Sequence, residues 1–294
     1  GMTEPSKGYH DLRFFEYFLT AGIFLATGSA IAGHNIERDS LRDVGTEANS
    51  YSSSPVTSQD GRFTAFLSTA TDLVPGDTNG QQDVYLRDRV AATTERISLT
   101  WSGGQPNGTC DYMDMSPDGR YVIFASSADN LVPSDTNVLW DVFLVDRTGP
   151  TIERVCLDNS GVQGNGHSYM PSISADGRYA VFSSGASNLV LGDADGAYDT
   201  FVRDRVAGTT ELISKTALGQ SIGSDDTADI SSDGRFVAYS STSSFLVPGD
   251  NNACNDIFVY DRLSQTTERA SIPDAGGEAF YWSRYPSLNS DGRF

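Results

Sequence analysis

Oxygen-bearing side chains recur along the chain at a spacing that suits a hard metal ion. An Asp-x-Asn/Asp motif begins at four equivalent positions: Asp77, Asp135, Asp193 and Asp250. In the first copy, Asp77, Asn79 and Asp83 take the first, third and seventh places of a loop that turns at Gly80. Ca²⁺ needs a cage of this kind, built from oxygen ligands around a tight turn. The loops are therefore candidate calcium sites.

The third copy has the best ligand set. It carries three carboxylates, Asp193, Asp195 and Asp199, together with Gly196. The other two copies lack the glycine and offer Asp135, Asn137 and Asp141 in the second, and Asp250, Asn252 and Asp256 in the fourth. A metal-free alternative stays open, because Asp and Asn in such loops often accept hydrogen bonds from their own backbone amides. The motif also lacks the distal bidentate glutamate of an EF-hand.

Catalytic arrangements are scarce. The three histidines, His10, His34 and His167, share no repeat position, and no hydrolase, metalloprotease or phosphate-loop motif is present. The best enzymatic hypothesis is a carbohydrate-active protein, a glycoside hydrolase or lyase, that uses two channel-facing acids. Asp114 and Asp229, in the expected innermost strands, are its candidates.

Aromatic residues near loops provide a second kind of candidate site. Such residues stand at Trp101, Trp140, Tyr198, Tyr281 and Trp282. Exposed aromatic side chains could bind a glycan or a protein partner. Packing inside the fold is the alternative.

The charge balance limits the classes of partner. With 20 Lys and Arg against 39 Asp and Glu, the formal net charge is −19. A field of this sign repels phosphate backbones and anionic lipids, so we expect no nucleic-acid partner and no binding to bare membrane. The three cysteines form no Cys-x-x-Cys pair and imply no disulfide framework or zinc site.

These candidate residues lie in an internal repeat. Asp-Gly-Arg recurs at Asp60, Asp118, Asp176, Asp233 and Asp291, at intervals of 57 or 58 residues. Each acidic loop starts 17 residues after the aspartate of its own Asp-Gly-Arg. The register is thus kept inside every unit, which indicates a repeat architecture.

Each unit predicts four short strands and no helix. The first run after the arginine is rich in β-branched and aromatic residues, at 63–68, 121–126, 179–184 and 236–241. A second run follows the acidic loop at 83–88, 141–146, 199–204 and 256–261. A third, such as Glu95–Leu99 or Glu153–Leu157, follows a turn, and a fourth, such as Pro171–Ser174, precedes the next Asp-Gly-Arg. Four strands in a repeated unit predict the blade of a β-propeller.

The Asp-Gly pair is turn chemistry, since Asp caps the turn and Gly accepts a positive φ. Antiparallel pairing then brings the arginine beside the aspartate that ends the next strand. We predict four ion pairs: Arg62–Asp88, Arg120–Asp146, Arg178–Asp204 and Arg235–Asp261.

The pattern Ser-x-Asp-Gly-Arg-[Phe/Tyr]-x-x-[Phe/Tyr]-x-Ser, followed by Leu-Val-x-x-Asp-x-Asn/Asp and Asp-x-[Tyr/Phe]-[Leu/Val]-x-Asp-Arg, resembles TolB-like, WD-repeat-like propeller repeats. The resemblance covers residues 36–294. It implies an all-β propeller of four-stranded antiparallel blades in a bacterial envelope or secreted protein. The chain departs from the pattern at Val138 and Ala253, which replace the loop glycine, and at Leu212, which replaces an arginine.

The two ends suggest how a ring could close. Residues 1–35 form an N-terminal segment in which 14–32 are apolar, follow Lys7 and Arg13, and end in Ala30-Ile31-Ala32, as in a signal peptide. We favour a second interpretation, degenerate strands, because Glu16 interrupts the apolar run. Residues 36–38 should then be the last strand of an incomplete blade.

At the other end, a fifth Asp-Gly-Arg starts at Asp291. We predict five blades, the last formed by N- and C-terminal strands, since closure removes exposed sheet edges.

We therefore expect a non-catalytic binding or scaffold propeller, stabilised by Ca²⁺, in the periplasm or outside the cell. A protein or a glycan is the expected partner, and we expect no membrane span in the mature protein. The carbohydrate-active enzyme is the alternative.

Overall fold

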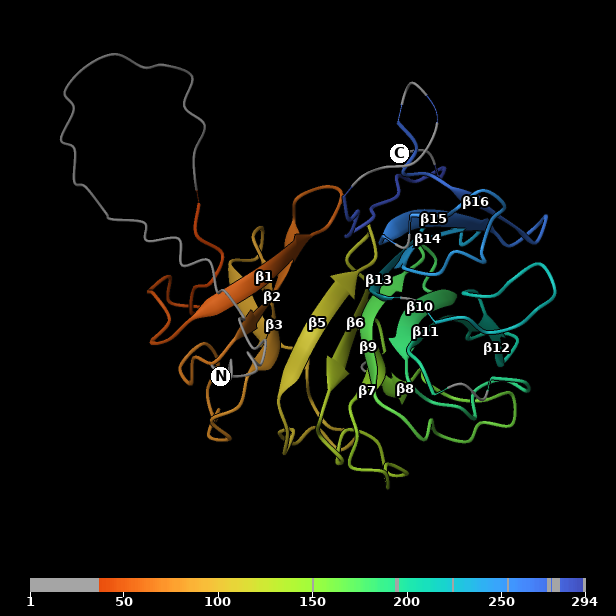
Figure 1. The fold of residues 1–294 in the computed structure, drawn as a ribbon. Helices are drawn as coiled ribbons and strands as arrows, with labels where there is room; N and C mark the ends of the chain where they lie inside the picture. The colour runs from red at the N-terminus through yellow and green to blue at the C-terminus, as the bar shows by residue number, and fades with distance from the viewer. Residues whose placement is uncertain are drawn as a thin grey trace, which may run out of the picture. The chain divides into compact units, whose positions relative to one another are not determined.

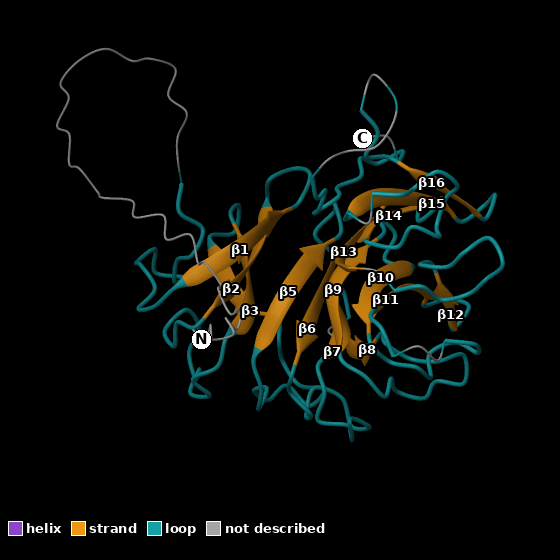
Figure 2. Ribbon diagram, viewed as in Figure 1, coloured by secondary structure: helices purple, strands orange, loops and turns teal. Residues whose placement is uncertain are grey.

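The computed structural model describes residues 37–149, 151–193, 196–223, 225–252, 254–273, 276 and 281–292. Apart from Glu37, these residues belong to one compact unit, Arg38–Phe294. Every regular element in the described ranges is a β-strand (Figure 2). Within them no helix is long and apolar enough to cross a membrane. Residues 14–32, with their two interpretations, lie outside the described part.

In the part of the chain that the structure describes, sixteen strands form four antiparallel sheets of four (Figure 1). We call them blades 1 to 4 in chain order. Blade 1 contains β1 (Ser52–Thr57), β2 (Phe63–Ser68), β3 (Asp83–Asp88) and β4 (Thr93–Arg96). Blade 2 contains β5 (Cys110–Met115), β6 (Tyr121–Ser126), β7 (Asp141–Asp146) and β8 (Thr151–Arg154).

The other two blades repeat the same order, so the prediction of four-stranded antiparallel blades is confirmed. Blade 3 contains β9 (Ser168–Ile173), β10 (Tyr179–Ser184), β11 (Asp199–Asp204) and β12 (Thr209–Leu212). Blade 4 contains β13 (Asp225–Ile230), β14 (Phe236–Ser241), β15 (Asp256–Asp261) and β16 (Thr266–Arg269).

The core lies between neighbouring blades. Leu67 and Val84 of blade 1 share one buried cluster with Val122, Phe124 and Phe143 of blade 2. Such side chains fill both faces of a central strand, which explains why β2, β6, β10 and β14 read as nearly continuous apolar runs. Burial of each large side chain stabilises the fold by about 1.5–3 kcal/mol. A blade alone would expose these faces to water.

The Asp-Gly-Arg hairpin has the predicted turn chemistry. In the first copy the Asp60 carboxylate accepts hydrogen bonds from the Arg62 amide and the Ser58 hydroxyl, at 3.0 and 2.6 Å. Gly61 has a φ of 69°, a conformation that favours glycine.

In each later Asp-Gly-Arg, the glycine also packs under an aromatic ring of the preceding unit, and this contact helps to hold successive units together. At Gly177, a Cβ atom would lie 2.3 Å from the ring of Tyr121. Equivalent contacts join Gly119 to Phe63, Gly234 to Tyr179 and Gly292 to Phe236. The fifth Asp-Gly-Arg therefore packs on blade 4 as its predecessors do on blades 1 to 3.

The four predicted ion pairs are confirmed. Each arginine reaches its aspartate with an N–O distance of 2.7 Å in Arg62–Asp88, Arg120–Asp146, Arg178–Asp204 and Arg235–Asp261. The Arg62 guanidinium also lies 4.7 Å from the centre of the Phe63 ring. These partly exposed pairs fasten the two central strands of each blade.

Three strand predictions were wrong in their bounds. The outermost strand of blade 2 is Thr151–Arg154 instead of Glu153–Leu157. The outermost strand of blade 1 is Thr93–Arg96 instead of Glu95–Leu99, because Thr93 already pairs with Asp88 across a short turn. The innermost strand of blade 3 starts at Ser168 rather than Pro171, with a β-bulge near Met170.

The strand predicted at 36–38 is also absent from the described residues Glu37 and Arg38. Arg38 forms an ion pair with Glu47, and the nearby bridge between Leu41 and Glu47 belongs to a loop.

Candidate binding site on the axis and the carboxylate loops

An arginine side chain lies between the two aspartates of the first acidic loop. The Arg96 guanidinium is 3.4 Å from Asp77 Oδ1 and 3.2 Å from Asp83 Oδ2. The hydroxyl of Tyr85 donates to Asp77, and the Asn79 amide donates to Asp83 at 3.1 Å. Both aspartates are buried, so this guanidinium supplies the positive charge that they need. Burial also raises the pKa of Asp83.

The second and fourth loops have the same arrangement. Arg154 lies 3.3 Å from Asp135 and 3.0 Å from Asp141. Arg269 lies 3.3 Å from Asp250 and 3.6 Å from Asp256. A metal ion in any of these three loops would have to displace a guanidinium. The side-chain amide of Asn137 donates to Gly164 O, and that of Asn252 donates to Asp256.

The third loop has no arginine at the position that supplies the guanidinium to the other three. Leu212 stands where the other blades have arginine, and its side chain is buried. Asp193 and Asp199 are buried as well, and the hydroxyl of Ser221 donates to Asp199 at 2.6 Å. Asp195 lies outside the described residues. Among those that are described, no three His, Cys, Asp or Glu side chains gather as a metal cluster.

The two candidate catalytic acids lie on inner strands and bond to neighbouring blades. Asp114 Oδ2, from β5, accepts a hydrogen bond from the Ile173 amide of β9 at 3.0 Å. Asp229 Oδ2, from β13, accepts one from the Leu288 amide at 2.7 Å. The hydroxyl of Ser172 donates to Asp229 Oδ1 at 2.7 Å. Both carboxylates thus join neighbouring units around the axis.

Asp114 also titrates in an unusual range. Burial is the main cause that raises the pKa of Asp114 to about 6, and the nearby Asp229 raises it further, although backbone amides and Ser172 oppose this. A raised pKa is a property of many catalytic acids, but structural networks produce it too. The donors on Asp114 are the amides of Met115 and Ile173, which favour the structural role.

A pocket of about 290 Å³ lies between the inner strands, and we call it the axial pocket. All five repeat units contribute to its lining, which comprises Ser54, Tyr112, Met113, Met170, Pro171, Thr227, Ala228, Tyr285 and Pro286. Two tyrosines, two methionines and two prolines make most of this surface apolar. No described acid lines it.

Backbone strain marks the axial pocket. Ser54, Tyr112, Met170 and Tyr285 occupy equivalent repeat positions and have positive φ angles of 50, 46, 50 and 58°. In β1, β5 and β9 these residues lie at β-bulges, which break the strand alternation. Strained residues of this kind gather at functional sites. Nothing in the sequence indicated this pocket, because the four positions carry three different residue types and none is glycine.

The aromatic residues near loops divide into two groups. Trp140 and Tyr198 lie against Tyr169, with ring centres 5.6 and 6.1 Å away. Trp140 and Tyr198 are therefore packed inside the fold, as the alternative interpretation predicts. Trp101, Tyr281 and Trp282 are exposed.

No protein-family model and no curated protein matches the chain. Solved structures with a similar fold include TolB from Agrobacterium tumefaciens, at 17% identity and a TM-score of 0.47 over 78% of this chain and 64% of that one. TolB from Acinetobacter baumannii has 18% identity and a TM-score of 0.43 over 76% of this chain and 44% of that one. An oligogalacturonate lyase in complex with manganese has 14% identity and a TM-score of 0.46, over 75% and 52%.

The chain spans less than two thirds of the length of each of these proteins. The likeness is one of fold, and two of the three are TolB proteins, the group that the repeat motifs resemble.

Proposed function

We propose that the chain is a non-catalytic binding module that takes a segment of a partner protein at the axial pocket. The observation that carries this proposal is the lining itself: five units meet in one apolar pocket, with Tyr112, Met170 and Tyr285 in strained positions. Methionine adapts its shape to a partner's side chains, and tyrosine offers a large apolar face with a polar tip. The two nearby acids are hydrogen-bonded by the protein's own backbone.

The same pocket supports a ring of five blades. Tyr285 and Pro286 of the fifth unit complete a lining that otherwise comes from blades 1 to 4. In our proposal residues 286–294 and the N-terminal strands form the fifth blade. The repeat motifs, which resemble those of bacterial envelope and secreted proteins, support the proposed location in the periplasm or outside the cell.

Photocrosslinking tests the proposed function. A benzophenone amino acid in place of Tyr112 should link one discrete protein from an envelope extract, and the link should weaken in a Tyr285→Ala background. The same label at Val90, exposed on an outer turn, is the control and should not link that protein. Hydrolysis or lysis of polysaccharides that disappears in Asp114→Asn and Asp229→Asn would contradict the proposal and favour the carbohydrate-active enzyme.

We further propose that Ca²⁺ binds the third acidic loop, through Asp193, Asp195 and Asp199, as a structural ion. Leu212 supports this, because blade 3 lacks the guanidinium that neutralises the paired aspartates in the other blades. Calcium binding to the folded state alone would add about 2.7 kcal/mol of stability at 100 times Kd.

The calcium proposal predicts a specific loss of response. Calcium should raise the melting temperature of the wild type relative to a chelator, and Leu212→Arg should abolish that difference by placing a guanidinium between the acids. Arg154→Leu, at the equivalent place in blade 2, is the matched comparison. An equal melting temperature of the wild type in calcium and in chelator would rule out the site.

A further inference from the structure

A loop of each unit lies against the outermost strand of the next blade. The four loops span residues 41–47, 99–105, 157–163 and 215–221, and each turns at an equivalent glycine with positive φ: Gly45, Gly103, Gly161 and Gly219. The loops thus share one backbone conformation. Their side chains at the equivalent positions Asp43, Trp101, Asn159 and Ala217 differ, and so does what they do to the neighbouring strand.

At blade 1 the contact is closed by polar groups. Asp43 accepts a hydrogen bond from the Thr94 amide of β4 at 2.6 Å, and the Thr94 hydroxyl donates to Leu41 O. Arg87 donates to the Thr94 hydroxyl from the adjacent strand at 3.1 Å. The outward amide of this edge strand therefore has an acceptor inside the protein.

Blade 3 repeats the closed contact with an uncharged cap. Asn159 accepts from the Thr210 amide of β12 at 2.6 Å. Arg203 donates to the carbonyls of Leu157 and Asp158 and to the Thr210 hydroxyl. At blade 2 the loop position is Trp101, which lines a small pocket of about 280 Å³ together with Val145 and Ile152.

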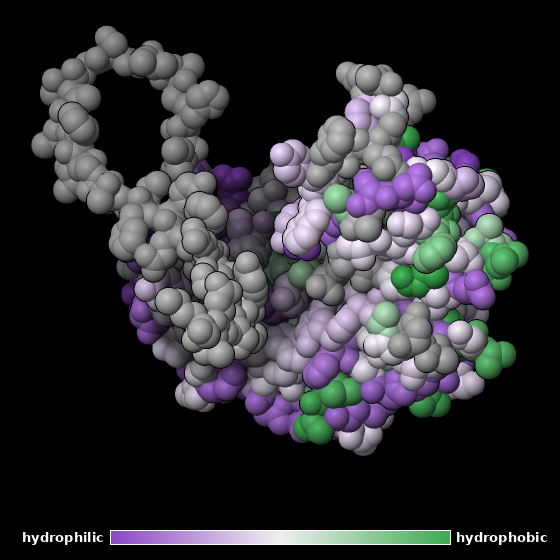
Figure 3. All heavy atoms as spheres, viewed as in Figure 1, coloured by the Kyte–Doolittle hydropathy of each residue, from purple (hydrophilic) through white to green (hydrophobic). Residues whose placement is uncertain are grey.

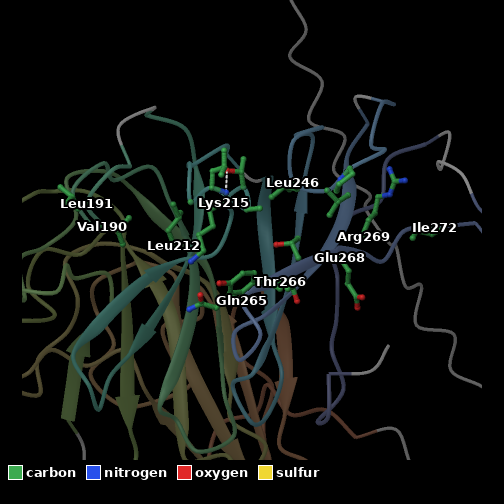
Figure 4. A pocket seen from close by; sticks show the side chains of 18 residues that line it. Val190, Leu191, Leu212, Lys215, Leu246, Gln265, Thr266, Glu268, Arg269 and Ile272 are labelled. Carbon is green, nitrogen blue, oxygen red and sulfur yellow. Dashed lines mark hydrogen bonds between the residues drawn. The ribbon is translucent and has the colours of Figure 1, made fainter.

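The loop beside blade 4 has neither an Asp or Asn cap nor a tryptophan at this position. Ala217 stands at the loop position and carries no acceptor, and Tyr260 replaces the arginine. A groove of about 940 Å³ remains between blades 3 and 4. Figure 4 shows Leu212 and Lys215 on one side of this space and Glu268 and Arg269 on the other, with Gln265 below Lys215. We call this space the open groove.

The walls of the open groove suit apolar side chains. Leu212, Leu218, Leu246, Val247 and Ile272 line it. Leu218 is 87% exposed, and Leu191, which also lines the groove, is fully exposed, so part of the apolar lining is open to a partner. Figure 3 shows hydrophobic side chains on the side of the molecule where Figure 1 places β12 and β16.

The edge of β16 supplies main-chain donors to the groove. The Ala270 amide bonds to Ile257 O, so antiparallel alternation turns the Thr267 amide away from β15. The equivalent amides of Thr94 and Thr210 are the ones capped by Asp43 and Asn159. Among the described residues no loop side chain caps Thr267 in this way. An extended chain could pair with this edge.

The charges favour a basic occupant. Lys215 is 3.4 Å from Glu211, which Arg262 also reaches at 3.3 Å, and the Arg269 guanidinium lies between the acids of the fourth loop. Both cations of the lining therefore already contact acids of this chain. Glu268, on the rim, is exposed. The formal net charge of −19 attracts cationic segments over longer distances.

We propose that the open groove between blades 3 and 4 binds an extended peptide segment that pairs with the edge of β16, places apolar side chains against Leu212, Leu218 and Ile272, and carries Lys or Arg beside them. This site is separate from the axial pocket, and neither proposal depends on the other.

A phage-displayed library of random short peptides tests the site. The full chain should enrich peptides with alternating apolar residues and at least one Lys or Arg. Ala217→Asn restores the neutral cap that Asn159 provides to blade 3, and it should weaken binding of an enriched peptide by about tenfold or more. Ala217→Trp, which copies Trp101 of the second loop, should do the same by covering the groove.

Controls separate this site from others. Asn159→Ala, at the closed contact, and Tyr112→Ala, at the axial pocket, should leave the affinity of the enriched peptide unchanged. Amide hydrogen exchange should slow at residues 265–270 when the peptide binds. Failure to enrich any peptide, equal affinity for Ala217→Asn and wild type, or protection of 265–270 that depends only on the concentration of the chain itself would overturn the proposal.

Discussion

At the scale of single residues, the Asp114 carboxylate both joins two neighbouring units by hydrogen bonds and has a pKa raised toward neutrality. Its oxygens accept the amides of Met115 and Ile173, and its neighbours include Ser172 and Asp229. The sequence placed Asp114 and Asp229 on inner strands, as the structure does. It carried no sign that backbone amides of the next unit would bond to them, because those partners lie 59 residues away.

The pKa of Asp114 predicts a pH dependence of stability. An ordinary aspartate has a pKa near 4, whereas that of Asp114 is about 6. Between these values the folded state binds more protons than the unfolded state, so stability should fall as the pH rises from about 4 to about 6. The loss attributable to Asp114 is on the order of 2 kcal/mol.

Thermal unfolding of wild type and Asp114→Asn measures this effect. The difference in stability between the two proteins should shift across that pH range in the stated direction. Parallel curves from pH 4 to pH 7 would show that Asp114 is not the titrating group.

The acidic loops carry a second lesson at the residue scale. Their aspartates were predicted from the repeat, but the role of Arg96, Arg154 and Arg269 was not. A signal was present, since the loop with three carboxylates is the one whose unit has Leu212 in place of arginine. The joint change to Asp195 and Leu212 in this unit indicates that an arginine neutralises the aspartates of the other three loops.

At the scale of elements, sequence patterns located the two central strands of each blade to the residue. Phe63–Ser68 and Asp83–Asp88 are buried on both faces, so their composition marks them clearly. The outer strand was misplaced because Ala92 takes a positive φ in the turn before it, which its residue type does not suggest. The bulge at Met170 hid the start of an inner strand for the same reason.

The contact between glycine and aromatic ring predicts how two equivalent glycines differ. Gly177 and Gly61 have the same φ of 69°, but a Cβ at Gly177 would meet the Tyr121 ring at 2.3 Å, whereas at Gly61 the nearest atom belongs to Arg89 at 3.8 Å. Alanine at either position bears the backbone strain. Gly177→Ala should destabilise the protein by a further 1–3 kcal/mol or so, because it also overpacks the joint between blades.

Denaturant unfolding of the two variants checks this expectation. Adding Tyr121→Ala should remove the extra destabilisation of Gly177→Ala and leave Gly61→Ala unaffected. Equal destabilisation by the two alanines would mean that the ring does not hold the glycine.

At the scale of the whole molecule, the repeat places an equivalent loop beside the outermost strand of every blade, but the side chain at the contact position differs from loop to loop. Asp43 and Asn159 cap the outermost strands of blades 1 and 3. Trp101 stands at the equivalent loop position beside blade 2, and Ala217 stands there beside blade 4. Sequence analysis aligned the units but could not show which loop faces which strand. That relation depends on the packing of one blade against the next, which no local pattern encodes.

Closure of a five-bladed ring is our central proposal, and the lining of the axial pocket by residues from all five units supports it. Val90, Val206 and Leu263 occupy equivalent exposed turns of blades 1, 3 and 4. Each can be replaced by a spin-labelled cysteine. Cys110 and Cys156 are buried, so only Cys254, which is partly exposed, needs replacement by serine first.

The decisive measurement is the pair of distances from blade 1 to blade 3 and from blade 1 to blade 4, by pulsed electron paramagnetic resonance. In a closed ring of five the two distances are equal, because blade 4 is also two steps from blade 1 in the other direction. A distance from blade 1 to blade 4 clearly longer than that from blade 1 to blade 3 would contradict closure at five blades.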